Sequence, residues 1–207
     1  MQKQINQLNE HELNVSRETL QKLQSYMTLI ERWNKSINLV SRKLQAEDIL
    51  KHIKDAVFLG RVLKKATRIL DLGSGNGLPG IVLSIMGFES ILVERNNKKA
   101  VFLKEVVRLL GLNAKVISAD IRDCYMVLQE IEIGCIVSKA VSDAKGVVDL
   151  CRPIINEDTL VYLFKKNSML DELKELKESY WCEPVVIENK NVSDSVLLEL
   201  KKIKFKR

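Results

Sequence analysis

The sequence is poor in the residues that build metal centres, and it lacks long apolar runs. It contains only two histidines, and its four cysteines form no Cys-x-x-Cys pair, which argues against zinc or another metal. No apolar run reaches the roughly 18 residues of a membrane-spanning helix, and the first residues lack the apolar segment of a signal peptide. We therefore expect a cytoplasmic protein that binds neither membrane nor metal. Its cysteines should be reduced and mostly buried: Cys124, Cys135, Cys151 and Cys182.

Aromatic residues are also scarce, at 5% of the chain, and no aromatic-rich RNA-binding motif is present. Basic residues outnumber acidic ones by 33 to 27, which gives a net charge of +6. Such a charge favours a polyanionic partner, although it also serves solubility. An RNA partner would then be recognised by the shape of its fold rather than by base stacking.

The first 66 residues are predicted to be helical. Apolar residues recur there at three- and four-residue spacing, from Leu20 to Trp33, and Ser16 is a plausible helix start. A second helix should cover residues 47–63. Trp33 lies on the apolar stripe, so a core position is favoured over a base-stacking one. We expect residues 1–66 to form a helical extension that packs on a core of residues 67–207.

From residue 68 onward, apolar runs alternate with helical patterns, which predicts a parallel sheet with crossover helices. Strands are expected at 68–72, 89–94, 114–118, 135–139 and 159–164, and helices at 78–86, 97–110, 121–129, 143–151 and 168–178. Gly111 should cap its helix. Two final apolar runs, 184–187 and 195–200, predict an antiparallel hairpin, followed by a basic tail over 201–207. This α/β arrangement is typical of class I S-adenosylmethionine-dependent methyltransferases, with a Rossmann-like sheet.

A glycine-rich loop follows the first of these strands, in the stretch from Asp71 to Gly80. Such a loop holds a nucleotide-like cofactor in doubly wound α/β proteins, because glycines let the backbone approach the ligand. Glu94 ends the second strand, where its carboxylate can accept both ribose hydroxyls. Together they predict a cofactor site at this edge of the sheet.

The spacing Gly75-x-Gly77-x-x-Gly80 also fits a dinucleotide site, so the type of cofactor needs further argument. Asp71 would repel a pyrophosphate but could hold the amino acid end of S-adenosylmethionine, directly or through water. Pro79 removes an N–H that a phosphate would use. Asp120 can accept from an adenine amino group while the next amide, that of Ile121, donates to the ring; Asp120 can equally be a helix N-cap.

The same residues closely resemble one family, the bacterial 16S rRNA guanine-N7 methyltransferases, also called glucose-inhibited division protein B. The block from Asp71 to Gly80 is the specific part of the resemblance, which covers nearly the whole chain. The other matching motifs are supportive: Trp33-Asn34 with Asn38-Leu39, Lys51-His52-Ile53-Lys54-Asp55, Lys98-Lys99 with Phe102-Leu103, Ser138-Lys139-Ala140 and Leu163-Phe164-Lys165.

Several positions depart from the family pattern. Lys139 stands where the family has Arg, which keeps the charge but loses planar bidentate contacts. Val40 replaces a common Thr, Ala56 a common Ser and Lys166 a Gly. The residues around Asp120 do not align cleanly with the family's small residue and Glu. These changes bear on substrate binding more than on the cofactor.

The resemblance implies methyl transfer from S-adenosylmethionine to N7 of a guanine in the 530-loop region of 16S rRNA. That nitrogen carries a lone pair and no proton, so no general base is required, and catalysis needs only positioning. Lys139 is the candidate catalytic residue, as a cation near guanine O6 or a phosphate; the alternative is a solvated surface lysine. The expected cofactor-binding residues are Asp71, Gly73, Ser74, Gly75, Gly77, Leu78, Glu94, Asp120, Ile121 and Lys139.

Candidate RNA-binding residues are Asn38, His52, Lys98, Lys99 and Lys165. His52 and Asp55 stand one helical turn apart, so a hydrogen-bonded packing pair is the alternative interpretation. Other basic residues that could track an RNA backbone are Arg42, Lys43, Lys51, Lys54, Lys64, Lys65 and the C-terminal tail. The expected partner is 16S rRNA or the small ribosomal subunit, bound by a monomer.

Other functions remain open on the sequence. A methyltransferase for another RNA, a protein or a small molecule would share the cofactor site. A nicotinamide-dependent oxidoreductase is disfavoured by Asp71 and Pro79. A non-catalytic RNA-binding module would need a blocked cofactor loop, and nothing in the sequence blocks it.

Overall fold

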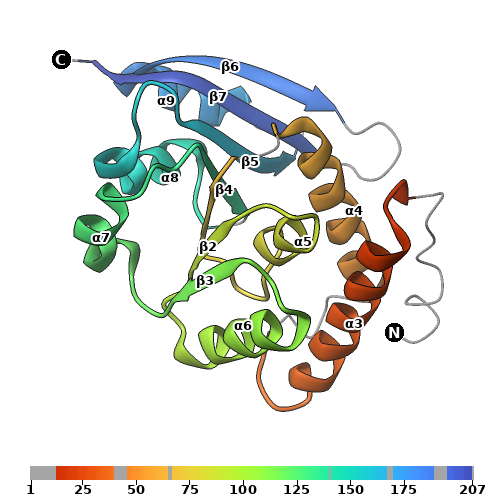
Figure 1. Cartoon of the computed structure of the whole chain (residues 1–207). Helices are drawn as coiled ribbons and strands as arrows, with labels where there is room; N and C mark the ends of the chain where they lie inside the picture. The colour runs from red at the N-terminus through yellow and green to blue at the C-terminus, as the bar shows by residue number, and fades with distance from the viewer. Residues whose placement is uncertain are drawn as a thin grey trace.

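The computed structural model describes residues 13–39, 46–64, 67–139, 141–166, 170–188 and 195–206. Over these ranges, a seven-stranded sheet is covered by helices on both faces (Figure 1). Five residues named above lie outside the described ranges: Val40, Arg42, Lys43, Lys65 and Ala140. The fold class predicted from the sequence is confirmed.

The strand order is β3-β2-β1-β4-β5-β7-β6. Strands β1 to β5 run parallel, whereas β7 runs antiparallel to both β5 and β6. The order of β1 to β5 reverses at β1, and in such sheets ligands bind beyond the carboxyl ends of the strands at that point. The strands are β1 (Ile69–Leu72), β2 (Ser90–Val93), β3 (Ala114–Ile117), β4 (Cys135–Lys139), β5 (Leu160–Lys166), β6 (Tyr180–Glu188) and β7 (Ser195–Phe205).

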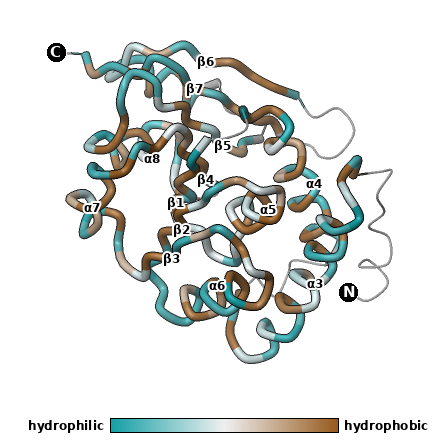
Figure 2. Tube along the Cα trace, viewed as in Figure 1, coloured by the Kyte–Doolittle hydropathy of each residue, from teal (hydrophilic) through white to brown (hydrophobic). Residues whose placement is uncertain are grey.

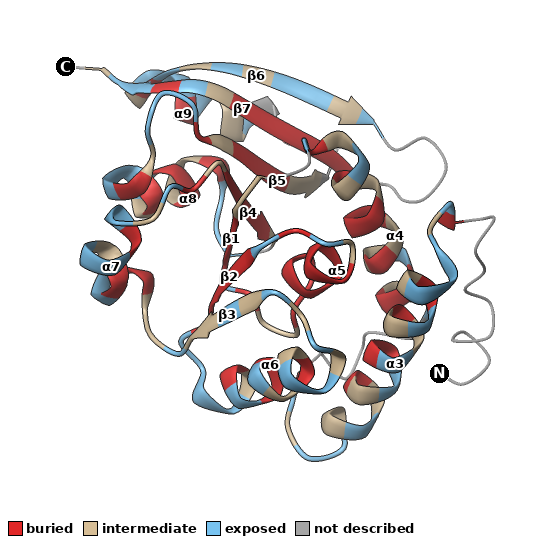
Figure 3. Ribbon diagram, viewed as in Figure 1, coloured by how far each residue is buried: buried red, intermediate tan, exposed pale blue. Residues whose placement is uncertain are grey.

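The central strands are buried on both faces (Figure 3). Every residue of β1 and β2 is buried, which explains why these strands appear in the sequence as continuous apolar runs rather than as alternating patterns. Two residues break the pattern, because Asp71 and Ser90 are polar and buried. The hydropathy view shows the same apolar centre with hydrophilic outer helix faces (Figure 2).

Four helices lie on one face of the sheet, and their apolar side chains belong to two buried clusters that also contain strand residues. In α3, the hydroxyl of Ser16 accepts a hydrogen bond from the amide of Thr19, so the predicted start is confirmed. In α6, the left-handed residue Gly111 caps the end as expected. These helices are α3 (Arg17–Asn34), α4 (Ala46–Val62), α5 (Gly80–Ile85) and α6 (Asn97–Leu110).

A second set of helices covers the other face. The predicted helix over 121–129 is two elements, a 3-10 turn capped by Asp120 and a short α-helix. A second 3-10 turn follows α8, where Pro153 stands near its start. The elements are η1 (Ile121–Cys124), α7 (Tyr125–Gln129), α8 (Ala144–Cys151), η2 (Arg152–Ile154) and α9 (Leu170–Ser179).

The basic tail predicted for residues 201–207 is wrong, because β7 continues to Phe205. Its lysines lie along a paired strand, and three of them form ion pairs. Lys201, Lys202 and Lys204 contact Glu199, Glu183 and Glu157 at 2.6, 2.8 and 2.7 Å. These three lysines, which were expected to bind RNA, are therefore paired with glutamates of this protein.

The N-terminal helices pack directly on the sheet region. Helix α3 contacts α5 and α6, and α4 contacts α5. Leu23 and Met27 of α3 share one buried cluster with Phe102 of α6. The division of the chain at residue 66 stays a prediction about sequence organisation.

Candidate functional site

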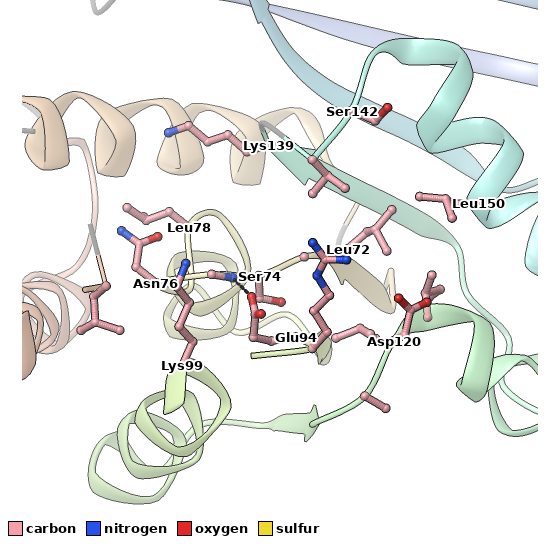
Figure 4. Close-up of a pocket in the computed structure, with 18 of the residues that line it drawn as sticks. Leu72, Ser74, Asn76, Leu78, Glu94, Lys99, Asp120, Lys139, Ser142 and Leu150 are labelled. Carbon is pink, nitrogen blue, oxygen red and sulfur yellow. Dashed lines mark hydrogen bonds between the residues drawn. The ribbon is translucent and has the colours of Figure 1, made fainter. Parts of the chain in front are cut away.

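A cavity of about 670 Å3 lies at the carboxyl ends of β1, β2 and β4, where the strand order reverses. We call it the main cavity. In Figure 4, Asp120 and Leu150 stand at one end, Glu94 lies in the middle, and Asn76, Leu78, Lys99 and Lys139 stand at the other end. The volume lies within the range of about 300–1,000 Å3 that is typical of small-ligand sites.

The glycine loop forms the floor of this cavity. Gly73, Gly75 and Gly77 all have positive φ, at 68°, 57° and 95°, a backbone region that side chains disfavour. A Cβ on Gly75 would have only the Gly73 carbonyl within 4 Å, at 3.8 Å, so this residue faces open space. A Cβ on Gly77 would instead meet Ile81 and Tyr26, which makes Gly77 a packing glycine outside the cavity wall.

Asp71 lies beneath the loop rather than in the cavity. Its side chain is 1% exposed, and its Oδ2 accepts a hydrogen bond from the amide of Gly80 at 3.0 Å. Burial raises the pKa of Asp71 to about 7, against the effect of that hydrogen bond. Asp71 therefore connects β1 to the start of α5 through this hydrogen bond.

Glu94 faces the main cavity and is already held by the backbone. Its Oε2 accepts from the amide of Gly75, and its Oε1 accepts from the amide of Asn96, both at 2.7 Å (Figure 4 for the glycine-loop contact). Each carboxylate oxygen has a second lone pair that remains available. Ser74 adds to the rigidity of the loop, because its hydroxyl donates to the Asp71 carbonyl at 2.9 Å.

Asp120 lines the far end of the cavity and also caps η1, so both roles foreseen for it are structurally compatible. Its carboxylate accepts two bonds from the Arg122 guanidinium, at 2.8 and 2.9 Å. These side-chain hydrogen bonds hold the pKa of Asp120 well below its usual range. The adjacent Ile121 is buried and contributes an apolar wall.

Lys139 ends β4 and lines the opposite end of the cavity. Its Nζ lies 5.9 Å from the centre of the Phe164 ring, on the neighbouring strand. Burial lowers the pKa of Lys139 to about 8, against the opposing effect of the Asp55 and Asp71 charges. Within the described residues, no carboxylate lies within ion-pair distance of its Nζ.

His52 also lines the main cavity, on α4. Its Nδ1 lies 3.9 Å from Oδ2 of Asp55, one turn further along the helix, and Asp55 is buried. Among the described residues, Nδ1 has no hydrogen-bond partner. The structure thus brings His52 and Lys139 to the same cavity, although the sequence places them 87 positions apart.

A second cavity of about 490 Å3 adjoins the first, and we call it the lysine pocket. It lies between the segment that follows α3 and the start of α6, and Lys99 lines both cavities. No acidic residue is among the described residues that line it: Asn34, Lys35, Ser36, Ile37, Asn38, Asn96, Lys98 and Lys99. Three of the predicted RNA-binding residues, Asn38, Lys98 and Lys99, are therefore brought together.

Lys165 is not brought to either cavity. Its Nζ donates to the Ser142 carbonyl at 3.0 Å and contacts Oε2 of Glu172 at 2.6 Å. Its side chain is only 11% exposed. Because the same Glu172 oxygen accepts from the amide of Ala144, Lys165 ties β5 to the start of α8 and to α9.

Sequence reasoning missed several residues of this region, including the following four. Arg95, Arg122 and Val141 line the main cavity, and Tyr26 contacts the glycine loop from α3. Arg95 directly follows Glu94 in the sequence, and this position could have indicated that it lines the cavity. Tyr26 carried no signal, because on the helical stripe it is indistinguishable from a core residue.

The main cavity fits S-adenosylmethionine in its chemistry. Gly75 leaves a cradle that a Cβ would partly fill, the Glu94 carboxylate has free lone pairs for hydroxyls, and Asp120 with Ile121 offers an acceptor beside an apolar wall. Among the described residues, no group of His, Cys, Asp and Glu is arranged to hold a metal ion. No helix in the described part of the chain has the length and apolar character to cross a membrane.

Comparisons with known proteins agree with this geometry. Solved structures with the same fold include MtNAS in complex with MTA and tNA (TM-score 0.58, 17% identity, covering 93% of this chain and 80% of that one). Another is cofactor-bound Rv0187 from MTB (TM-score 0.61, 12% identity, covering 88% and 90%). At these identities the likeness establishes the fold.

Sequence comparisons establish the family. Ribosomal RNA small subunit methyltransferase G of Parvibaculum lavamentivorans is 37% identical over 174 residues, covering 81% of this chain and 76% of that protein. The protein of the same name from Jannaschia sp. is 33% identical and covers 90% of each. Residues 19–196 match the family model described as rRNA small subunit methyltransferase G. The chain therefore belongs to the rRNA small subunit methyltransferase G family.

Proposed function

We propose that this protein transfers the methyl group of S-adenosylmethionine to N7 of a guanine in the 530-loop region of 16S rRNA. One observation carries the proposal beyond family membership. The acceptors Asp120 and Glu94 and the cation Lys139 follow one another along a single cavity, whose cationic end adjoins the lysine pocket. The cofactor groups and the lysine pocket thus meet at Lys99, which lines both cavities.

The cofactor would be held by groups that the fold already positions. Asp120 and the amide of Ile121 would take the adenine, and Glu94 would take the ribose hydroxyls. The backbone of Gly73, Ser74 and Gly75 would line the amino acid end, with Leu78 as an apolar wall. The bound cofactor supplies an activated methyl group, and the residues of the chain supply its placement.

Methylation at N7 requires little acid–base chemistry from the protein. Guanine N7 has an in-plane lone pair and no proton, so no residue needs to act as a base. Lys139 would hold the target guanine by its O6 acceptor, because O6 and N7 are the atoms that a cation reads on this base. Its burial strengthens that contact. Holding donor and acceptor close and in line then supplies the rate.

The lysine pocket would carry the RNA backbone past the reaction site. Lys98 and Lys99 stand in the first turn of α6, where the positive end of the helix dipole also favours an anion. Asn38 adds polar hydrogen-bonding groups on the opposite wall. Such contacts position a nucleic acid without reading its sequence. Lys165 has no part in this path, because its ammonium group is engaged with Ser142 and Glu172.

We also propose that the enzyme acts in the cytoplasm as a monomer. The +6 net charge supports an RNA partner, which is a polyanion. Static light scattering of the purified protein tests the monomer, which an apparent mass of twice 23.7 kDa would contradict.

The direct test is a tritiated-methyl transfer assay with small ribosomal subunits that lack the modification. Naked 16S rRNA, a total protein extract and a small-molecule extract are assayed in parallel. Label released as 7-methylguanosine after nuclease digestion, from subunits or rRNA, is expected. Label in protein or in small molecules would replace the proposed substrate by one of those classes, and label in another RNA would keep the reaction but change its target.

A further inference from the structure

A buried tyrosine connects the N-terminal helices to the glycine loop. The hydroxyl of Tyr26, in the middle of α3, donates a hydrogen bond of 2.6 Å to the backbone carbonyl of Asn76, 50 residues later. Tyr26 is 0% exposed, and Asn76 lines the main cavity. The contact therefore joins a helix that lies outside the cavity to the backbone of its floor.

The loop has room for this hydroxyl only because of a glycine. A Cβ on Gly77 would lie 2.9 Å from the Tyr26 oxygen and 2.5 Å from a carbon of Ile81. Such distances would force the two segments apart. The glycine at position 77 thus permits the close approach of α3, while Gly75 faces the ligand space.

The bond continues through two peptide units toward Glu94. A peptide unit is planar, so fixing the Asn76 carbonyl also fixes the Gly77 amide. That amide donates to the Ser74 carbonyl at 2.7 Å, and the Ser74 carbonyl shares its peptide unit with the Gly75 amide. The Gly75 amide in turn donates to Oε2 of Glu94 at 2.7 Å. One chain of hydrogen bonds therefore runs from Tyr26 to the cavity carboxylate, and its members polarise one another.

The tyrosine is suited to a permanent donor role. Burial, together with the negative charge of Asp71, raises the pKa of Tyr26 well above its usual value, so the hydroxyl keeps its proton. Asp71 itself braces the other end of the same loop through Gly80. The loop is thus held from α3 at Asn76 and from β1 at Gly80.

We propose that Tyr26 is a positioning residue for the cofactor: its hydroxyl, acting through the Asn76 and Ser74 carbonyls, sets the Gly75 amide and the Glu94 carboxylate in their binding geometry. The identity of the cofactor as S-adenosylmethionine rests on the proposed function. The hydrogen-bond chain itself does not depend on which cofactor is bound.

The variant Tyr26→Phe keeps the buried ring and removes only the hydroxyl. We expect the S-adenosylmethionine dissociation constant, measured by calorimetry, to rise about tenfold, the scale of one lost buried hydrogen bond. In the transfer assay, the KM for S-adenosylmethionine should rise while kcat at saturation and the KM for RNA stay within about twofold. The matched control is Tyr180→Phe, which removes a hydroxyl bond of 2.7 Å to Asp149 away from the cavity.

Amide hydrogen exchange of the ligand-free protein gives a second readout. Tyr26→Phe should speed exchange in the loop over residues 73–80 but leave β1 (Ile69–Leu72) as slow as in the wild type. Equal acceleration of the loop and β1 would mean a general loss of stability and would overturn the proposal, as would unchanged exchange together with unchanged affinity. If the wild type failed to bind S-adenosylmethionine, the proposed function would fall, whereas the exchange pattern would still decide the role of Tyr26.

Discussion

The two ends of the main cavity are built in different ways. At the Asp120 end and in the middle, the carboxylates are already hydrogen-bonded, Asp120 to Arg122 and Glu94 to the amides of Gly75 and Asn96. At the other end, Lys139 has no ion pair with a described carboxylate, and Nδ1 of His52 has no hydrogen-bond partner among the described residues.

This difference matches the difference between the two proposed ligands. A small cofactor is the same at every turnover, so groups fixed in advance bind it with little loss of conformational entropy. A guanine within a large RNA arrives with its own acceptors, and these can complete the partners of a buried cation. We infer that the cofactor end is preorganised and that the substrate end is completed on binding.

The largest effect should come from breaking the cofactor end with Gly75→Asp. The added carboxylate enters the space that Gly75 leaves open and repels Glu94, to which its amide is bonded. We expect S-adenosylmethionine affinity to fall at least about 100-fold by calorimetry, since like charges at contact distance in a cavity cost several kcal/mol.

Gly111→Asp is the matched control for that variant. Gly111 has nearly the same φ, +58°, and a Cβ there meets nothing within 4 Å. Both variants should lose similar thermal stability, because both strain a left-handed residue. Normal cofactor affinity in Gly75→Asp would remove the glycine loop from the site.

The next largest effect should come from the substrate end, with Lys139→Ala. Loss of the buried cation should lower kcat for methyl transfer by about 100-fold, the usual scale for one electrostatic contact at a reacting group. The S-adenosylmethionine dissociation constant should change by less than about threefold. Equal losses in both quantities would move Lys139 from the substrate to the cofactor.

The pH dependence of the methyl-transfer rate tests the substrate end of the cavity without a mutation at either end. Burial lowers the pKa of Lys139 to about 8, so its charge is present below that pH and is lost as the pH rises through it. The rate should fall roughly fivefold between pH 8 and 9, following the protonated fraction. Lys139→Arg, which stays protonated, should lose this alkaline limb. An alkaline limb in Lys139→Arg that equals the wild-type one would assign the titration to another group.

The smallest effect concerns the lysine pocket. Lys98→Ala should weaken RNA binding a few-fold and reduce the slope of log affinity against log salt by about 0.7, the share of one phosphate contact on a single strand. The control is Lys104→Ala, an exposed lysine on the same helix outside the pocket. Identical salt slopes for both variants would show that the pocket lysines bind no phosphate.

The sequence predicts the parts of this protein that follow from local pattern. Apolar runs locate the strands to within about two residues, apart from the longer hairpin strands, and closely spaced glycines locate the loop, three of which have positive φ in the structure. Strand β7 is longer than predicted because its lysines alternate with apolar residues and pair with glutamates, Lys201 with Glu199 of β7 itself and Lys202 with Glu183 of β6. From the sequence alone, a lysine-rich segment of this kind cannot be distinguished from an unpaired tail, because the strand pairing and the ion pairs are not visible.

The residues that sequence reasoning misplaced are those whose role depends on distant partners. Lys165 lies near the carboxyl end of its strand just as Lys139 does, yet Glu172 of α9 holds it away from the cavities. Tyr26 became visible only when α3 was seen to reach Asn76. Asp71 was expected at the ligand and lies beneath the loop, because α5 begins close enough for the Gly80 amide to reach its carboxylate.

The ion pairs of β7 have a consequence for how a polyanion meets this protein. The charges of a lysine and a glutamate that lie 2.6–2.8 Å apart nearly cancel each other for an ion further away than one Debye length, about 8 Å at physiological salt. These paired lysines of β7 therefore add little to the long-range electrostatic field of a chain that carries +6 overall. The lysine pocket, with no acid among its described lining residues, adds its full charge. An RNA diffusing nearby is thus steered toward the side of the molecule where the reaction cavity opens.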